Sequence, residues 1–143
     1  MTIKIPVDRI RRYKKLTTNT RKQVNMLLGT NIKRITYKNL SDFIDMDSED
    51  LYGYTVIDKK TKTIVILLHN IYKLELKEGP EVAERVLVET IFHEARHLWQ
   101  IHNIFAVYHI STLDPNVKWL IENDANQFTT MNTKIIDEIL KET

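Results

Sequence analysis

The period of the apolar positions divides the chain into helical and extended segments. Residues 19–28 place several aliphatic side chains on one helical face, and Gly29 follows as a stop signal. Residues 32–37 alternate imperfectly between apolar and polar side chains, which indicates a β-strand. The acidic stretch at residues 42–50 is interpreted as a loop that is partly helical. The first part of the chain therefore predicts one helix followed by one strand.

Two further β-rich runs lie close together in the middle of the chain. Residues 52–57 and 63–68 are rich in β-branched, aliphatic and aromatic side chains, and a short lysine-rich segment separates them. Such a pair is typical of a β-hairpin with a polar turn. The sequence therefore predicts a small antiparallel sheet.

The pattern changes to a helical period after Pro80, a residue that suits the first turn of a helix. From there to about residue 103 most positions are apolar, which is typical of a buried helix. Asp114 and Pro115 then supply the cap and first-turn proline of a final helix, whose apolar side is expected to include Met131. The order of helix, sheet, central helix and final helix predicts an α+β domain.

The central helix carries the sequence His93-Glu94-Ala95-Arg96-His97. Residues four apart lie on one helical face, so His93 and His97 can bind the same metal ion. Glu94 is turned by about 100° from His93, which places its carboxylate beside the ion as a general base for metal-bound water. Burying two imidazoles and a carboxylate without a partner would cost several kcal/mol, which favours a zinc site over an incidental cluster.

A catalytic zinc site requires a third protein ligand. His102 lies five residues after His97, so the chain lacks the extended pattern with a third histidine six residues on. Glu122 in the final helix is the preferred ligand, and Asp124, on a different side of that helix, is the alternative. Asn126 follows Glu122 by four residues and is expected to orient a ligand imidazole by a hydrogen bond.

These two motifs resemble those of the minimal gluzincins of the ImmA/IrrE type. Members of that family are small metallopeptidases encoded by bacteria, phages and integrative elements. The resemblance rests on His93-Glu94-x-x-His97 and on the later Glu-x-x-Ala-Asn sequence that begins at Glu122. It implies a minimal zincin-like domain in which the two histidines and Glu122 bind Zn²⁺ and Glu94 is the base.

The resemblance also directs attention to residues that contact the substrate. In such folds the strand nearest the metal lies at the sheet edge and pairs with an extended peptide. The strand proposed for this role includes Thr63, Ile64, Val65 and Ile66. Tyr108 and His109, in the segment after the metal-binding helix, are candidates for stabilising an oxyanion.

Composition and charge narrow the class of protein. A chain of 143 residues fits a single domain over residues 1–143, and the lack of cysteine excludes disulfides and thiolate metal sites. No apolar run suggests a signal peptide or a membrane span, so the expected location is the cytoplasm. Residues 1–38 hold eleven Lys or Arg and one acid, whereas the remainder carries an excess of acids. This basic segment binds either the acidic part of the same domain or an acidic partner or nucleic acid.

Two functions fit these observations. The first is a zinc metallopeptidase that hydrolyses an intracellular protein or peptide substrate, with Glu94 activating the attacking water. The second is a non-cleaving, zinc-bearing phage or mobile-element protein that binds a host protein or nucleic acid. Glu94 favours the first function, because a purely structural zinc site has no use for a base beside the metal.

Overall fold

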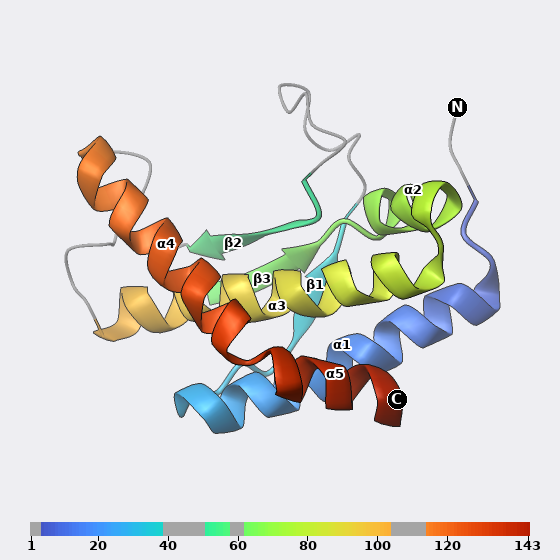
Figure 1. Cartoon of the computed structure of the whole chain (residues 1–143), viewed down its shortest axis with the longest axis horizontal. Coiled ribbons are helices and arrows are strands. Elements are labelled where there is room, and N and C mark those ends of the chain that lie inside the picture. The colour runs from blue at the N-terminus through green and yellow to red at the C-terminus, as the bar shows by residue number, and fades with distance from the viewer. Residues whose placement is uncertain (1–3, 39–50, 58–61, 104–113) are drawn as a thin grey trace.

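The structure, a computed structural model, describes residues 4–38, 51–57, 62–103 and 114–143 (Figure 1). The elements follow one another in the order α1 (Val7–Leu28), β1 (Ile35–Tyr37), β2 (Gly53–Ile57), β3 (Lys62–Ile66), α2 (Leu68–Glu78), α3 (Pro80–Asn103), α4 (Pro115–Met131) and α5 (Thr133–Glu142). This arrangement confirms the α+β class. None of the described helices is long and apolar enough to cross a membrane.

The sheet has three strands in the order β1-β3-β2. The expected hairpin is present, since β2 pairs antiparallel with β3 from Gly53 opposite Ile66 onwards. The expectation of a purely antiparallel sheet is wrong, because β1 pairs parallel with β3, with Ile35 opposite Ile64. An alternating pattern marks a strand but not its direction. The stretch of chain between β1 and β3, which includes β2, is long enough for the crossover that a parallel pair requires.

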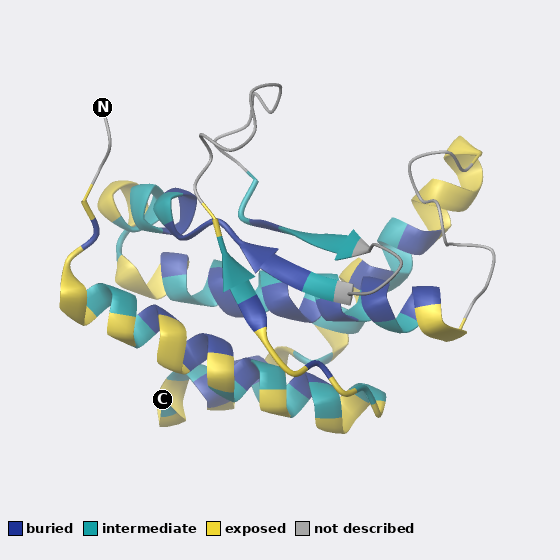
Figure 2. Ribbon diagram, turned by 180° about the vertical axis from the view of Figure 1, so that it is seen from behind, coloured by how far each residue is buried: buried dark blue, intermediate teal, exposed yellow. Residues whose placement is uncertain are grey.

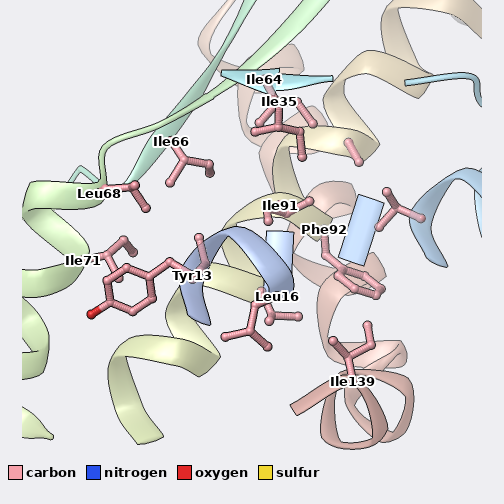
Figure 3. Close-up of a cluster of buried hydrophobic side chains, with 14 of the residues drawn as sticks. Tyr13, Leu16, Ile35, Ile64, Ile66, Leu68, Ile71, Ile91, Phe92 and Ile139 are labelled. Carbon is pink, nitrogen blue, oxygen red and sulfur yellow. The ribbon is translucent and has the colours of Figure 1, made fainter. Parts of the chain in front are cut away.

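The central helix α3 organises the hydrophobic core. It contacts all four other described helices and strands β2 and β3. Figure 2 shows its buried positions lying behind the sheet, with α1 running alongside. Fully buried side chains from α3, such as Leu87, Ile91 and Phe92, belong to the same hydrophobic cluster as Ile64 and Ile66 of the sheet. Figure 3 shows part of this cluster. Each such side chain contributes roughly 1.5–3 kcal/mol by leaving water, so α3 is held rigidly against its neighbours.

The first helix begins at Val7, well before the predicted start at residue 19. Its buried face includes Thr17 and Thr20, whose hydroxyls donate to the carbonyl oxygens of Tyr13 and Leu16. Because these buried threonines bond within the helix, they interrupt the apolar pattern without exposing an unsatisfied polar group. Because of that interruption, the pattern of apolar residues did not reveal the first half of the helix.

The helices at both ends of α3 also differ from the prediction. Residues 68–78 form α2, which the sequence pattern did not reveal, and α2 is joined to α3 through Gly79. The final helix is divided at Asn132 into α4 and α5. Asn132 donates from its side-chain amide to the carbonyl of Phe128, and the change of direction brings α5 against the core. Met131, expected on the apolar side, is instead 83% exposed.

Some of the basic residues of the N-terminal segment form ion pairs within the domain. Arg9 on α1 forms ion pairs with Glu75 of α2 and Glu84 of α3, and Arg12 also pairs with Glu84. The hydroxyl of Tyr13 donates to the same Glu75 carboxylate at 2.6 Å. These contacts support the interpretation that the basic segment binds the acidic part of its own domain. The predicted acidic stretch at residues 42–50 lies outside the described residues.

Candidate metal centre

The metal-ligating side chains predicted on α3 lie one helical turn apart, at the edge of the core. Phe92 and Ala95 on the same helix are fully buried, which fixes the direction in which the neighbouring residues point. The imidazole planes of His93 and His97 are nearly perpendicular, and their Nε2 atoms are 3.0 Å apart. One ligand atom from each of His93, Glu94 and His97 lies within 4.8 Å of the others, so this group could hold a metal ion.

A second carboxylate approaches the same point from α4. Ala125 is fully buried where α4 crosses α3, and its small side chain lets the two helices approach closely. One turn earlier, Glu122 places Oε1 at 3.0 Å from Nε2 of His97 and Oε2 at 3.2 Å from Nε2 of His93. Two ligand atoms of a tetrahedral zinc site with bonds of about 2.0–2.1 Å lie about 3.3 Å apart. The observed separations are therefore close to those of a metal-centred tetrahedron.

The two carboxylates near the histidines are in different situations. Oε2 of Glu94 accepts a hydrogen bond of 2.6 Å from the hydroxyl of Thr55 on β2, so one of its oxygens is directed at the sheet. Both oxygens of Glu122 face the imidazole nitrogens, and this side chain is 42% exposed. Glu122 therefore directs both oxygens at the imidazoles, whereas Glu94 has one oxygen bonded to the sheet.

Asp124, the alternative ligand, is occupied elsewhere. Its Oδ2 accepts from Nε of Arg96 at 2.8 Å and from Nε2 of Gln100 at 2.7 Å. The hydrogen bond from Arg96 holds the pKa of Asp124 below its usual value and so favours the carboxylate. Asn126 lies close enough to His93 to raise the pKa of that imidazole slightly against the effect of burial. Asp124 is thus linked to His97 through the side chain of Gln100.

Burial shifts the pKa of two groups at the site, His93 and Glu94. It lowers the pKa of His93, and the neighbouring His97 lowers it further, so the neutral imidazole that a metal requires is favoured. Burial also raises the pKa of Glu94 above its usual value, while the hydrogen bond from Thr55 opposes this shift. A carboxylate whose pKa is raised toward neutrality is a more effective proton acceptor and donor near neutral pH.

The site opens into a cleft of about 570 Å³ between α3, α4 and the start of β2. Its walls include His93 and Glu94 on α3, Gly53 on β2 and Asn126 on α4. A larger cavity of about 1040 Å³ lies between residues 28–36 and the end of α3, and it shares no lining residue with the cleft. Of these two cavities, the smaller cleft is the one lined by His93 and Glu94.

The prediction that residues 63–66 form an edge strand of the sheet, available to a substrate, is wrong. Residues Thr63, Ile64, Val65 and Ile66 belong to β3, which pairs with β1 on one side and β2 on the other, so it is the central strand and not an edge. The edge strand that borders the cleft is β2. An apolar pattern identified β3 as a strand but could not give its place in the sheet. Tyr108 and His109 lie outside the described residues.

Two residues at the site were not singled out from the sequence. Gln100 is buried beside His97, and its position three residues further along the same helix was a usable signal. Thr55 reaches Glu94 only because β2 packs against α3, and no local spacing indicates such a contact. The first could have been found by extending the motif by one helical turn, whereas the second needed the tertiary structure.

Comparisons with protein families, with curated proteins and with solved structures find no significant match for this chain. Function is therefore inferred from the geometry of the site and from the two short motifs.

Proposed function

We propose that this protein is a zinc-dependent peptidase of the minimal gluzincin type, acting on an intracellular protein or peptide. The observation that carries the proposal is the convergence of the Glu122 carboxylate on the Nε2 atoms of both His93 and His97, at 3.0–3.2 Å. Converging acceptor atoms repel one another unless a proton or a cation lies between them. A carboxylate held next to them by Thr55 is the further group that hydrolysis requires.

The ligand set fits zinc better than the common alternatives. Two imidazoles and one carboxylate form a recurrent catalytic zinc site that leaves one position open. Magnesium and calcium prefer all-oxygen ligands, so the two histidines disfavour them. When bound, the zinc ion would lower the pKa of a coordinated water and polarise the carbonyl of the scissile bond.

Glu94 would carry the proton transfers. Its carboxylate would take a proton from the water as the water oxygen bonds to the carbonyl carbon. The same group would then give that proton to the departing amide nitrogen as the C–N bond breaks, so one water is consumed and a carboxylate and an amine are formed. Thr55 would hold the carboxylate in place during both steps.

Strand β2 is suited to bind the substrate in extended form. It forms an edge of the sheet as described, and its first residue, Gly53, lines the cleft next to His93 and Glu94. A peptide that pairs with such an edge gains main-chain hydrogen bonds independent of its side chains. The scissile bond would then lie between β2 and α4, over Glu94.

The runner-up function is a non-cleaving, zinc-bearing protein that binds a host protein or nucleic acid. The observation in its favour is the row of exposed cations Arg11, Lys15 and Lys22, which recur at helical spacing on the outer face of α1. Arg9 and Arg12 are paired within the domain and do not belong to this row. The poised Glu94 carboxylate has no role in this alternative.

A cleavage assay separates the two functions. Zinc-loaded protein and its Glu94→Gln variant would be incubated with a peptide library made from a proteome digest, and new N-termini would be identified by mass spectrometry. We expect cleavage by the wild type, loss of it in Glu94→Gln, and equal zinc content in both proteins. Zinc binding without any cleavage by the wild type would favour the binding protein instead.

A further inference from the structure

The side-chain amide of Gln100, a residue of α3, forms contacts with both α3 and α4. It is 1% exposed, so water does not compete for its hydrogen bonds. Its Nε2 donates to the main-chain oxygen of Ile121 at 3.0 Å and to Oδ2 of Asp124 at 2.7 Å. Its Oε1 lies 2.8 Å from Nδ1 of His97. The contact with Nδ1 involves a predicted metal ligand directly, and the other two involve residues near Glu122 on α4.

The neighbours of Gln100 allow only one orientation of its amide. A carbonyl oxygen and a carboxylate oxygen can accept but not donate, so the amide NH₂ must face Ile121 and Asp124. The reversed amide would place its oxygen against the Asp124 oxygen at 2.7 Å. Oδ2 of Asp124 is itself fixed by Nε of Arg96, which is always a donor. The amide oxygen of Gln100 therefore faces His97.

This orientation determines which nitrogen of His97 carries the proton. An amide oxygen only accepts, so Nδ1 of His97 must be the N–H donor in the 2.8 Å contact. A neutral imidazole has one N–H, which leaves Nε2 with a free lone pair. Nε2 is the atom that faces Glu122 and His93. The hydrogen bonds of Gln100 thus leave the lone pair of Nε2 of His97 available to bind a metal ion in the metal-free protein.

The same amide also fixes the position of α4. Ile121, whose carbonyl accepts from Gln100, is the residue immediately before Glu122. The guanidinium of Arg96, which holds Asp124, lies 3.8 Å from the ring centroid of Trp99 and is thereby anchored to α3. Two contacts from α3 therefore set where α4 places the Glu122 carboxylate.

We propose that Gln100 is a positioning residue for the metal centre, which selects the Nδ1–H tautomer of His97 and sets the place of Glu122 relative to it. The role of Gln100 in metal binding rests on the proposed zinc site. The tautomer itself is a property of the metal-free protein and can be observed whether or not the chain is a peptidase.

The test compares two substitutions in the metal-free protein by long-range ¹H–¹⁵N NMR of the imidazole rings, together with zinc affinity measured by chelator competition. In Gln100→Leu, Nδ1 loses its acceptor, and we expect His97 to shift toward the Nε2–H tautomer. We expect its zinc affinity to fall about 10–100-fold. In Gln100→Glu a carboxylate still accepts from Nδ1, so the Nδ1–H tautomer should be kept, but Ile121 and Asp124 lose their donor, so the zinc affinity should still fall.

Gln127→Leu, which changes an exposed glutamine on α4, is the matched control and should alter neither readout. The inference would be overturned if the wild type held the Nε2–H tautomer, or if Gln100→Leu kept both the tautomer and the zinc affinity of the wild type. A wild type with the Nδ1–H tautomer that binds no zinc would instead sink the proposed function, while the assignment of the tautomer to Gln100 would stand.

Discussion

Thr55 and Glu94 join the edge of the sheet to the candidate metal centre. The hydroxyl of Thr55 on β2 donates to Oε2 of Glu94 on α3 at 2.6 Å, and the two residues are 39 positions apart in the chain. This hydrogen bond directly joins the strand that borders the cleft to the carboxylate beside the histidines. A substrate that pairs with β2 would be held at a fixed distance from the proposed base.

Replacing Thr55 tests this connection. Thr55→Val keeps the shape of the side chain but removes the hydroxyl, and a hydrogen bond to a charged group is worth about 1.5–3 kcal/mol. We expect kcat/KM at neutral pH to fall about 10-fold or more, with the zinc content unchanged. Because Thr55 lowers the pKa of Glu94, its removal should move the acidic limb of the pH–rate profile to higher pH.

Thr55→Ser is the control, since it retains a hydroxyl at the same position and should keep most of the activity. Equal pH–rate profiles for wild type and Thr55→Val would show that the hydrogen bond does not affect the base.

Gly53 permits the close approach of β2 to α3. A Cβ atom at this position would lie 2.8 Å from Cγ2 of Thr90 and 2.9 Å from the main-chain oxygen of Val65. Gly53→Ala should therefore displace the strand and lower the free energy of unfolding by about 1–3 kcal/mol, as measured by urea denaturation. It should also reduce activity beyond the loss of stability, because Thr55 moves with the strand.

Gly29→Asn provides a matched control for the loss of a glycine. Gly29 has a φ of 63°, a Cβ atom at this position would meet no other atom within 4 Å, and asparagine tolerates this left-handed conformation. Its effect on activity should be small. If Gly53→Ala were as stable and active as the control, the close packing of β2 on α3 would not be required.

Tyr13 predicts a dependence of stability on alkaline pH. Burial, and then the hydrogen bond to Glu75, raise the pKa of this tyrosine above its ordinary value of about 10. The folded protein thus retains the phenolic proton at a pH where the unfolded chain releases it. The stabilisation is complete below a pH of about 10 and is lost as the pH rises toward the folded-state pKa.

Urea unfolding at a pH of about 8 and at a pH of about 11 measures this effect. The fall in the free energy of unfolding between the two pH values should be smaller in Tyr13→Phe than in the wild type. Tyr72→Phe on α2, a partly buried residue, is the control and should keep the wild-type dependence. The same pH dependence in wild type and Tyr13→Phe would contradict the role of the buried phenol.

The sequence predicted those parts of the molecule that local spacing determines. The hairpin of β2 and β3, the central helix α3 and the capped start of α4 follow from period, proline and capping signals, and all are confirmed. The approach of Glu122 to the two histidines was also expected, because a loop between two helices can return the second antiparallel to the first.

Features that depend on contacts between distant segments could not be predicted in this way. The central place of β3 depends on the insertion of that strand between β1 and β2, which no pattern within the strand reveals. The buried threonines of α1 look polar in sequence and become compatible with the core only through their bonds within the helix.

The proposed metal centre is tested most directly by the zinc content of the purified protein, measured beside its His97→Ala, Glu122→Gln and Glu89→Gln variants. We expect about one zinc per chain in the wild type and in Glu89→Gln, which alters a carboxylate one turn away on α3, and a marked loss in the other two. A wild type that takes up no zinc at neutral pH, or a Glu122→Gln variant that retains it fully, would contradict the proposed metal centre.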